Sequence, residues 1–226
     1  MASRRVADVT EDVTAIAKYL DIDQFAVLGR SGGGPHALAC AALLPERVTR
    51  AGVLVSLAPW EGMGHQWFNG MADSNVLEYT AAASEPLALA TRLAQAAAKI
   101  KADPTSHVAT LSPEMPEDDR RVVADAGIRA LLAQNFAEAL RESAAGWIDD
   151  ALAFRMPWGF DPADIQAPVL LWHGAEDVFS PVAHTQWLAE KIRRAEVVIQ
   201  PGTAHFGALE VVPDVLSWLI RPTPAR

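Results

Sequence analysis

Cysteine and long apolar runs are scarce in this chain. Cys40 is the single cysteine among 226 residues, so the sequence excludes an internal disulfide and a cysteine-based zinc site. No apolar run approaches the roughly 18 residues that a membrane-spanning helix needs. The segment from Met1 to Asp12 carries two arginines without an apolar stretch, which is not typical of a secretory signal. We therefore expect a cytoplasmic protein with no membrane partner.

Positive charge is also in short supply. Lysine and arginine number 19 against 28 acidic residues, giving a net charge of −9 and a pI near 5.1. This balance argues against nucleic acid and anionic membrane surfaces as partners. The spacing of histidine and carboxylate residues suggests no metal site. A small molecule is the expected partner.

Nucleotide-binding signatures are absent from the one glycine-rich segment. Residues 29–34 contain four glycines between an expected strand and an expected helix. Pro35 and His36 follow, however, where a Walker loop requires lysine and then serine or threonine. A dinucleotide loop needs an acidic residue at the end of the next strand, and the first carboxylate there is Glu61, too late in the chain. We expect no cofactor.

Strand-like and helix-like segments alternate at both ends of the chain, whereas the middle is helical and rich in alanine. Alternation of this kind predicts an α/β fold with a parallel sheet covered on both sides. We assign residues 1–58 and 167–226 to that core and residues 59–166 to an inserted helical cap. The expected strands are 24–28, 51–56, 168–173 and 196–200, and the expected helices are 6–20, 35–44, 76–101, 118–126, 128–154, 181–193 and 211–220.

Ser31 stands between a short apolar strand and a helix-like segment, with glycine two positions away on each side. This arrangement is typical of a nucleophile elbow, a tight turn that presents a serine hydroxyl at the carboxyl edge of a sheet. We expect a Cβ at Gly29 or Gly33 to collide with neighbouring backbone. We also expect the Gly32 N–H, at the positive end of the new helix, to face an oxyanion formed beside Ser31.

A nucleophilic serine needs a base to take its proton and an acid to orient that base. In folds that carry the elbow, the chain order is serine, acid and histidine, with each partner on a loop after a later strand. Asp177 follows the third expected strand and His205 follows the fourth. Both therefore belong at the carboxyl edge of the sheet, where ligands bind in open α/β sheets.

Other residues compete for these two roles. Glu176 is an alternative acid, although Asp177 fits the expected spacing better. His36 and His173 are alternative bases, but neither follows the last strand, so structural roles are favoured for both.

Three further histidines have less defined expectations. His65 and His107 lie in the insert, where solvent exposure and substrate contact both stay open. His184 falls on an expected helix, and we predict an exposed position for it.

Three motifs occur in a fixed order, each after its own strand: Gly29–Gly33, Gly174–Asp177 and Gly202–His205. In these motifs the chain resembles the α/β-hydrolase fold superfamily, in the branch with a helical cap, over about residues 6–220. The resemblance implies Ser31 as nucleophile, His205 as general base, Asp177 as acid and Gly32 as an oxyanion donor.

Four residues are candidates for contact with the substrate. Arg30 adjoins the nucleophile, Phe206 adjoins the histidine, and Trp60 and Trp147 lie near the two ends of the insert. Aromatic residues of a cap shape an apolar pocket or simply pack on the core, and the sequence leaves both open. For Arg30 the alternative is a surface position that the turn tolerates.

The resemblance also implies strands that this sequence does not show. The family places four strands before the elbow strand, with a His-Gly motif that supplies a second oxyanion donor, but only residues 1–23 precede that strand here. We expect strands 1–4 to be absent, the strand at 24–28 to form a bare edge, and a second copy to be able to pair there. Loss of one oxyanion donor costs on the order of 10²- to 10³-fold in rate.

These features predict a hydrolase of small carboxylic esters that works through an acyl-enzyme on Ser31. Serine at the elbow disfavours epoxide hydrolase and dehalogenase chemistry, which in this fold use aspartate there. Carbon–carbon hydrolysis, perhydrolysis and peptidase action keep the same triad and stay open. A truncated homologue without catalytic activity is the alternative from a different class.

Overall fold

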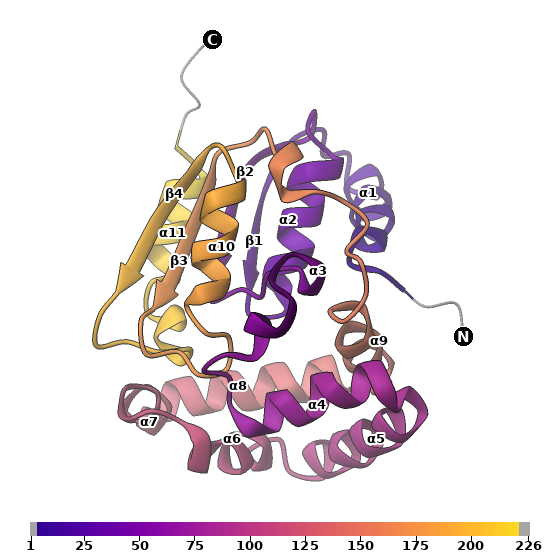
Figure 1. Cartoon of the computed structure of the whole chain (residues 1–226), viewed down its shortest axis with the longest axis vertical. Helices are drawn as coiled ribbons and strands as arrows, with labels where there is room; N and C mark the ends of the chain where they lie inside the picture. Colours follow the sequence, from indigo (N-terminus) through magenta and orange to yellow (C-terminus); the bar gives the residue numbers. More distant parts are fainter. Residues whose placement is uncertain (1–3, 222–226) are drawn as a thin grey trace.

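Four parallel strands form the centre of the fold: β1 (Phe25–Arg30), β2 (Val48–Leu54), β3 (Val169–Gly174) and β4 (Ala195–Gln200). The structure is a computed structural model and describes residues 4–221, so the first residues of the segment considered above as a secretory signal lie outside it. The strand order is β1-β2-β3-β4. All four strands therefore end at the same edge of the sheet, as the sequence predicts (Figure 1).

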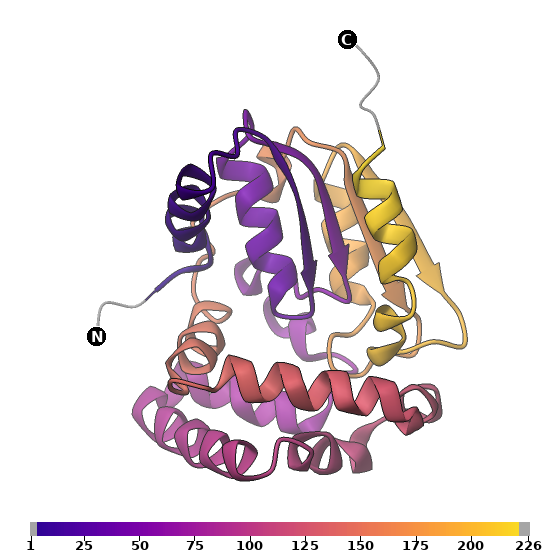
Figure 2. The ribbon, with the colours of Figure 1, turned by 180° about the vertical axis from the view of Figure 1, so that it is seen from behind.

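Helices cover both faces of this sheet. Helices α2 (Gly33–Leu43) and α10 (Ala183–Lys191) lie on one face, and α11 (Val212–Leu219) lies on the other (Figure 2). The buried side chains Leu38, Val53 and Leu171 meet on the first face, while Trp172 and Val215 meet on the second. Burial on both faces explains why β2 and β3 read as nearly continuous apolar runs. A short 3-10 turn, η1 (Val6–Asp8), leads into α1 (Val9–Tyr19), which packs outside α2.

A helical segment between β2 and β3, referred to below as the cap, lies beyond the carboxyl edge of the sheet (Figure 1). It begins near the core with α3 (Trp60–Met63) and η2 (Gly64–Phe68). Three small apolar clusters hold its helices together and join them to the core. The remaining segments are α4 (Asp73–Ser84), α5 (Pro86–Ala102), α6 (Ser106–Leu111), η3 (Ser112–Glu114), α7 (Glu117–Ala124), α8 (Ala126–Ala139), α9 (Ala145–Ala153) and η4 (Pro162–Asp164).

Two long helices expected in the cap are each divided in the structure. The segment 76–101 breaks at Glu85, because Pro86 cannot continue the helix before it and instead begins α5. The segment 128–154 breaks at residues 140–144, where the Ser143 hydroxyl accepts a hydrogen bond from the Ala145 N–H at the start of α9. Proline and capping residues thus end these helices at positions that the apolar periodicity of the sequence does not indicate.

Strand β1 lies at one edge of the sheet formed by the described residues, as expected. Its Leu28 side chain is 37% exposed, and β4 forms the other edge with Val197, Val198 and Ile199 also partly exposed. Pairing of two copies through the β1 edge stays a prediction. No helix between residues 4 and 221 is long and apolar enough to cross a bilayer.

Candidate active site

Ser31 occupies a strained turn between β1 and α2. Its φ is +54°, a left-handed value that is uncommon for residues other than glycine. The Ser31 N–H donates to the Leu54 carbonyl at 2.8 Å, and the Gly34 N–H donates to the Ser31 carbonyl at 2.9 Å. These bonds fix the turn at the end of the strand, and strain of this kind is concentrated at functional sites.

The glycines around Ser31 have different reasons for being glycine. A Cβ at Gly29 would lie 2.1 Å from the Gly33 carbonyl oxygen, so the expected collision is present there. At Gly33 no atom lies within 4 Å of an added Cβ, and the expectation for that position is wrong because its hydrogen faces open space. Gly34, which the sequence did not single out, would place a Cβ 2.2 Å from the Ser56 hydroxyl oxygen.

Asp177 lies in the loop after β3 and is buried. Its Oδ1 accepts hydrogen bonds from the backbone N–H groups of Phe179 at 2.8 Å and Ser180 at 3.0 Å. Its Oδ2 accepts from His205 Nδ1 at 2.8 Å and lies 3.2 Å from His173 Nε2. Burial by itself raises the pKa of Asp177, but the two histidines outweigh it and hold that pKa well below its usual value.

His205 follows β4 and is also buried, with the Phe179 and Phe206 rings beside it. Because its Nδ1–H donates to Asp177, its Nε2 is left free to accept a proton. Desolvation lowers the pKa of His205, and the Asp177 carboxylate opposes that shift without reversing it. The neutral imidazole required of a base is therefore the favoured form near neutral pH.

The competing acid and base candidates have structural roles. His173 Nε2–H donates to the Ser180 carbonyl at 2.6 Å, and the Thr185 hydroxyl donates to His173 Nδ1 at 2.7 Å, which secures the Asp177 loop. Glu176 accepts a hydrogen bond from the Thr203 N–H at 3.0 Å, joining the acid loop to the loop that carries His205. Neither residue lines the cavity described below.

The remaining histidines are spread between core and cap. His36 Nε2 lies 2.9 Å from Asp150 Oδ1 and thereby links α2 to α9. His107 packs edge-on against Phe136 and Trp147. The prediction for His184 is wrong: its ring is fully buried, because it accepts a hydrogen bond from the Ala58 N–H and donates one to the Trp67 carbonyl.

A cavity of about 940 Å³ separates the cap from the carboxyl edge of the sheet. Ser31 and His205 line it together with three of the predicted contact residues, Arg30, Trp147 and Phe206. Helices α4, α5, α6 and α8 supply most of the opposite wall. No hydrogen bond between the described residues joins the Ser31 hydroxyl to His205, although catalytic hydrogen bonds often tighten only when substrate is bound.

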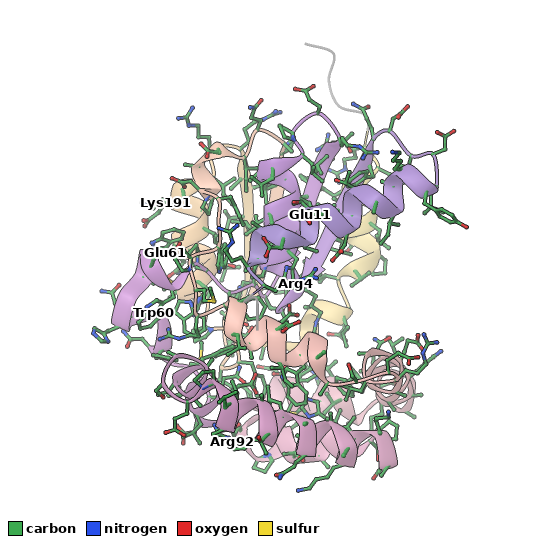
Figure 3. The ribbon with its side chains drawn as sticks, turned by 90° about the vertical axis from the view of Figure 1, so that its right-hand side faces the viewer. Arg4, Glu11, Trp60, Glu61, Arg92 and Lys191 are labelled. Atoms are coloured by element: carbon green, nitrogen blue, oxygen red, sulfur yellow. The ribbon has the colours of Figure 1, made fainter. Side chains whose placement is uncertain are left out.

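The structure does not bring Trp60 to this cavity. Trp60 lies on α3, at the level where core and cap meet, whereas the cap residue Arg92 lies far from it on α5 (Figure 3). The Trp60 ring stacks under the Arg155 guanidinium, 3.5 Å from its Cζ, and also contacts Phe68. Because Trp60 contacts Arg155 and Phe68, it belongs to the junction between the core and the cap and not to the cavity wall.

Gly32 is the N-cap residue of α2, and no hydrogen bond between residues 4 and 221 uses its N–H. A free N–H beside Ser31 at a helix start is suited to stabilise an oxyanion. In the same described range, no group of three or more histidine, cysteine or carboxylate side chains is arranged to hold a metal ion.

Asp119 is a residue of this site that the sequence analysis missed. It belongs to cap helix α7, is fully buried, and its Oδ1 accepts the Phe206 N–H at 2.6 Å. This bond reaches the start of the 3-10 turn η5 (Phe206–Leu209), directly after His205. Burial raises the pKa of Asp119 to about 6, against the opposing effect of the Phe206 N–H. No local motif marks Asp119, since 87 residues separate the two partners.

Comparison with known proteins identifies relatives over almost the whole chain. The family described as "alpha/beta hydrolase fold" matches residues 3–210. The dihydrolipoyllysine-residue acetyltransferase component of the acetoin cleaving system of Pseudomonas putida is 27% identical over 208 residues, 92% of this chain. The chain spans about half of that relative, 48% of its length.

Solved structures resemble the fold over a similar range. An enol-lactonase from Burkholderia xenovorans superposes with a TM-score of 0.60 at 19% identity, covering 96% of this chain and 71% of the enzyme. A 2-hydroxy-6-oxo-6-phenylhexa-2,4-dienoate hydrolase from a Rhodococcus strain gives 0.58 at 16% identity, with 96% and 71% covered. At these identities the likeness concerns the fold.

Proposed function

The chain belongs to the alpha/beta hydrolase fold family, and on that premise we propose that it hydrolyses small carboxylic esters through Ser31, His205 and Asp177. The observation that carries the proposal is the buried pair of His205 and Asp177, joined at 2.8 Å, whose His205 lines the same cavity as Ser31. A base that is oriented by an acid and placed beside a strained serine is the arrangement that nucleophilic catalysis needs.

Each step of the proposed reaction uses a group already described. His205 Nε2 takes the Ser31 hydroxyl proton while the Ser31 oxygen attacks the ester carbonyl carbon. The resulting oxyanion accepts a hydrogen bond from the Gly32 N–H. When the tetrahedral intermediate collapses, the carbon–oxygen bond to the leaving alcohol breaks and His205 returns the proton to that alcohol.

A second half-reaction regenerates the enzyme. Water attacks the acyl group on Ser31 and gives one proton to His205, and the second tetrahedral intermediate then breaks the bond to Ser31 Oγ. The proton returns to Ser31, and a carboxylic acid leaves. Asp177 stays ionised throughout, because the donors around it keep its pKa low, and it stabilises the histidine cation in both halves.

Hydrolysis of a panel of short-chain methyl esters, followed by proton release, tests this proposal. We expect turnover by the wild-type chain and its loss in Ser31→Ala, with Ser217→Ala as a control because that serine is exposed on α11. Equal turnover by wild type and Ser31→Ala would contradict the proposal. Carbon–carbon hydrolysis, perhydrolysis and peptidase action stay predictions, because they would use the same three residues.

A further inference from the structure

Arg30 carries a positively charged guanidinium, and most of its N–H donors have no hydrogen-bond partner among the described residues. One guanidinium nitrogen, Nη2, donates to the His205 carbonyl at 3.1 Å, and the Cζ atom lies 5.3 Å from the centre of the Phe206 ring. Its Nε is shielded from solvent and has no hydrogen-bond partner. A guanidinium offers five N–H donors in a planar fork that matches a carboxylate.

No carboxylate of the described residues forms an ion pair with Arg30. Asp177 is committed to His205 and to two backbone N–H groups, and Asp119 is committed to the Phe206 N–H. Both lie near enough to raise the pKa of Arg30, but burial outweighs them and lowers it to about 10. A partly buried charge without a paired anion is costly, so an anionic ligand at this position gains more than it would at a fully exposed arginine.

Arg30 lies on the cavity wall beside the reacting groups, with Ser31 next to it in sequence and the His205 carbonyl in contact with it. We propose that Arg30 binds a carboxylate of the substrate, which is therefore a monoester of a short dicarboxylic acid. This inference rests on the proposed function, because it places the second carboxylate relative to an ester bound at Ser31.

The charges on the opposite wall orient such a substrate. Glu78 lies on α4, where it accepts a hydrogen bond from Trp147 Nε1, and burial raises the pKa of Glu78 above its usual value. Arg92 and Glu85 also line the cavity on the cap side, and Arg92 lowers the pKa of Glu78, so the two carboxylates offset the charge of Arg92. The carboxylate of the substrate is therefore attracted to Arg30 rather than to the cap, which leaves the apolar alcohol portion to meet the cap helices.

Two esters whose acyl groups have the same number of carbon atoms test whether Arg30 binds a substrate carboxylate or affects the reaction in another way. Monomethyl glutarate and methyl valerate differ by one terminal carboxylate in place of a methyl group. We expect the wild-type chain to have a kcat/KM for the monoester about 10- to 100-fold above that for methyl valerate, the range set by a charge-assisted hydrogen-bonded pair. Arg30→Gln should reduce that preference by a similar factor, mainly through KM, and Arg30→Lys should restore part of it.

Arg141→Gln is the matched control, because it removes the same charge from an exposed cap position outside the cavity. An equal loss of kcat for both esters in Arg30→Gln would overturn the proposal, since it would show that Arg30 supports the His205 loop or the oxyanion. Circular dichroism of each variant verifies that the fold is retained, and Arg30→Lys provides a second variant should Arg30→Gln fail to fold.

Binding provides a readout that does not depend on turnover. Calorimetric titration of the Ser31→Ala chain with monomethyl glutarate should detect binding that Arg30→Gln weakens about 10-fold or more. If the wild-type chain hydrolyses neither ester but this titration behaves as expected, the proposed function fails while the carboxylate site stands. No difference between the two titrations would overturn the site.

Discussion

Three hydrogen-bond donors converge on the single carboxylate of Asp177. Two are backbone N–H groups from its own loop, and the third is the His205 Nδ1–H. The His173 Nε2 also lies 3.2 Å from the Asp177 Oδ2. Each stabilises the ionised form, which keeps the acid charged beside the base although the carboxylate is buried. The His173 ring is fixed in turn by Ser180 and Thr185, so the orientation of Asp177 does not depend on substrate.

The pH dependence of the reaction follows from His205. Burial lowers the pKa of His205, Arg30 and His173 lower it further, and Asp177 opposes them. A lowered pKa means that the imidazole loses its proton at a lower pH than free histidine does, and only the neutral ring accepts the Ser31 proton. We therefore expect kcat/KM to rise with pH to a plateau, with an apparent midpoint below about 6.5, the value of free histidine.

Initial rates of ester hydrolysis between pH 4.5 and 8.5 measure this rise of kcat/KM with pH, which forms the acidic limb of the profile. The Asp177→Asn variant should lose on the order of 10⁴-fold in rate, because an amide cannot stabilise the histidine cation in the same way. A limb with a midpoint above pH 7 in the wild-type chain would contradict the assigned environment of His205.

At the scale of elements, the turn between β1 and α2 depends on close approach of two backbones. A methyl group at position 29 would lie 2.1 Å from the Gly33 carbonyl oxygen and 2.9 Å from the Ala37 Cβ. We predict that Gly29→Ala destabilises the fold by about 1–3 kcal/mol, which lowers Tm by roughly 2–12 °C in a domain of this size.

Gly33→Ala is the matched substitution four residues later. Nothing lies within 4 Å of a Cβ there, and alanine favours the first turn of α2. Its Tm should equal or exceed that of the wild-type chain in thermal unfolding followed by circular dichroism. A Gly29→Ala chain as stable as wild type would show that the turn is looser than described.

Helix α7 of the cap is tied through Asp119 to the loop that carries His205. The Asp119 Oδ1 accepts a hydrogen bond from the Phe206 N–H, one residue after His205, and its Oδ2 is buried without a hydrogen-bond partner. We predict that Asp119→Ala lowers kcat/KM about 10- to 100-fold, because misplacement of a catalytic group by about 1 Å has effects of this size. Asp119→Asn should retain most of the activity, since its amide oxygen can still accept the N–H.

Comparison of Asp119→Ala with Asp119→Asn separates the effect of the hydrogen bond to the Phe206 N–H from the effect of the Asp119 charge. If Asp119 acts only by holding the loop, Asp119→Asn should keep both the plateau rate and the acidic limb assigned to His205 near their wild-type values. Unchanged rates in Asp119→Ala would show that η5 keeps its place without α7.

At the scale of the whole molecule, local motifs were readable from the sequence and long-range contacts were not. Ser31, Asp177 and His205 each follow a strand at a fixed spacing, so parallel strand order alone brings them to one edge. Asp119 could not be found this way, because its contact depends on how the cap folds over that edge. His184 was misassigned because a helical histidine looks exposed until its two buried backbone partners are known.

The cap shows the same limit. Its helical character and its place between the second and third strands were predicted, and the structure has helices throughout that range. The division at Pro86 and the place of Trp60 against Arg155 depend on local capping and on the junction with the core, which apolar periodicity does not encode. Of the four residues predicted to contact the substrate, Arg30, Trp147 and Phe206 line the cavity, and Trp60 does not.

Reaction with a fluorophosphonate tests the central claim most directly, because a base-activated serine oxygen attacks its phosphorus, displaces fluoride and forms a stable phosphonate ester. Mass spectrometry of the digested wild-type chain should locate one adduct on Ser31, and the adduct should be lost in His205→Ala but retained in Ser217→Ala. A folded wild-type chain that takes up no probe, or that is labelled equally well without His205, would contradict the assignment of Ser31 and His205 as nucleophile and base.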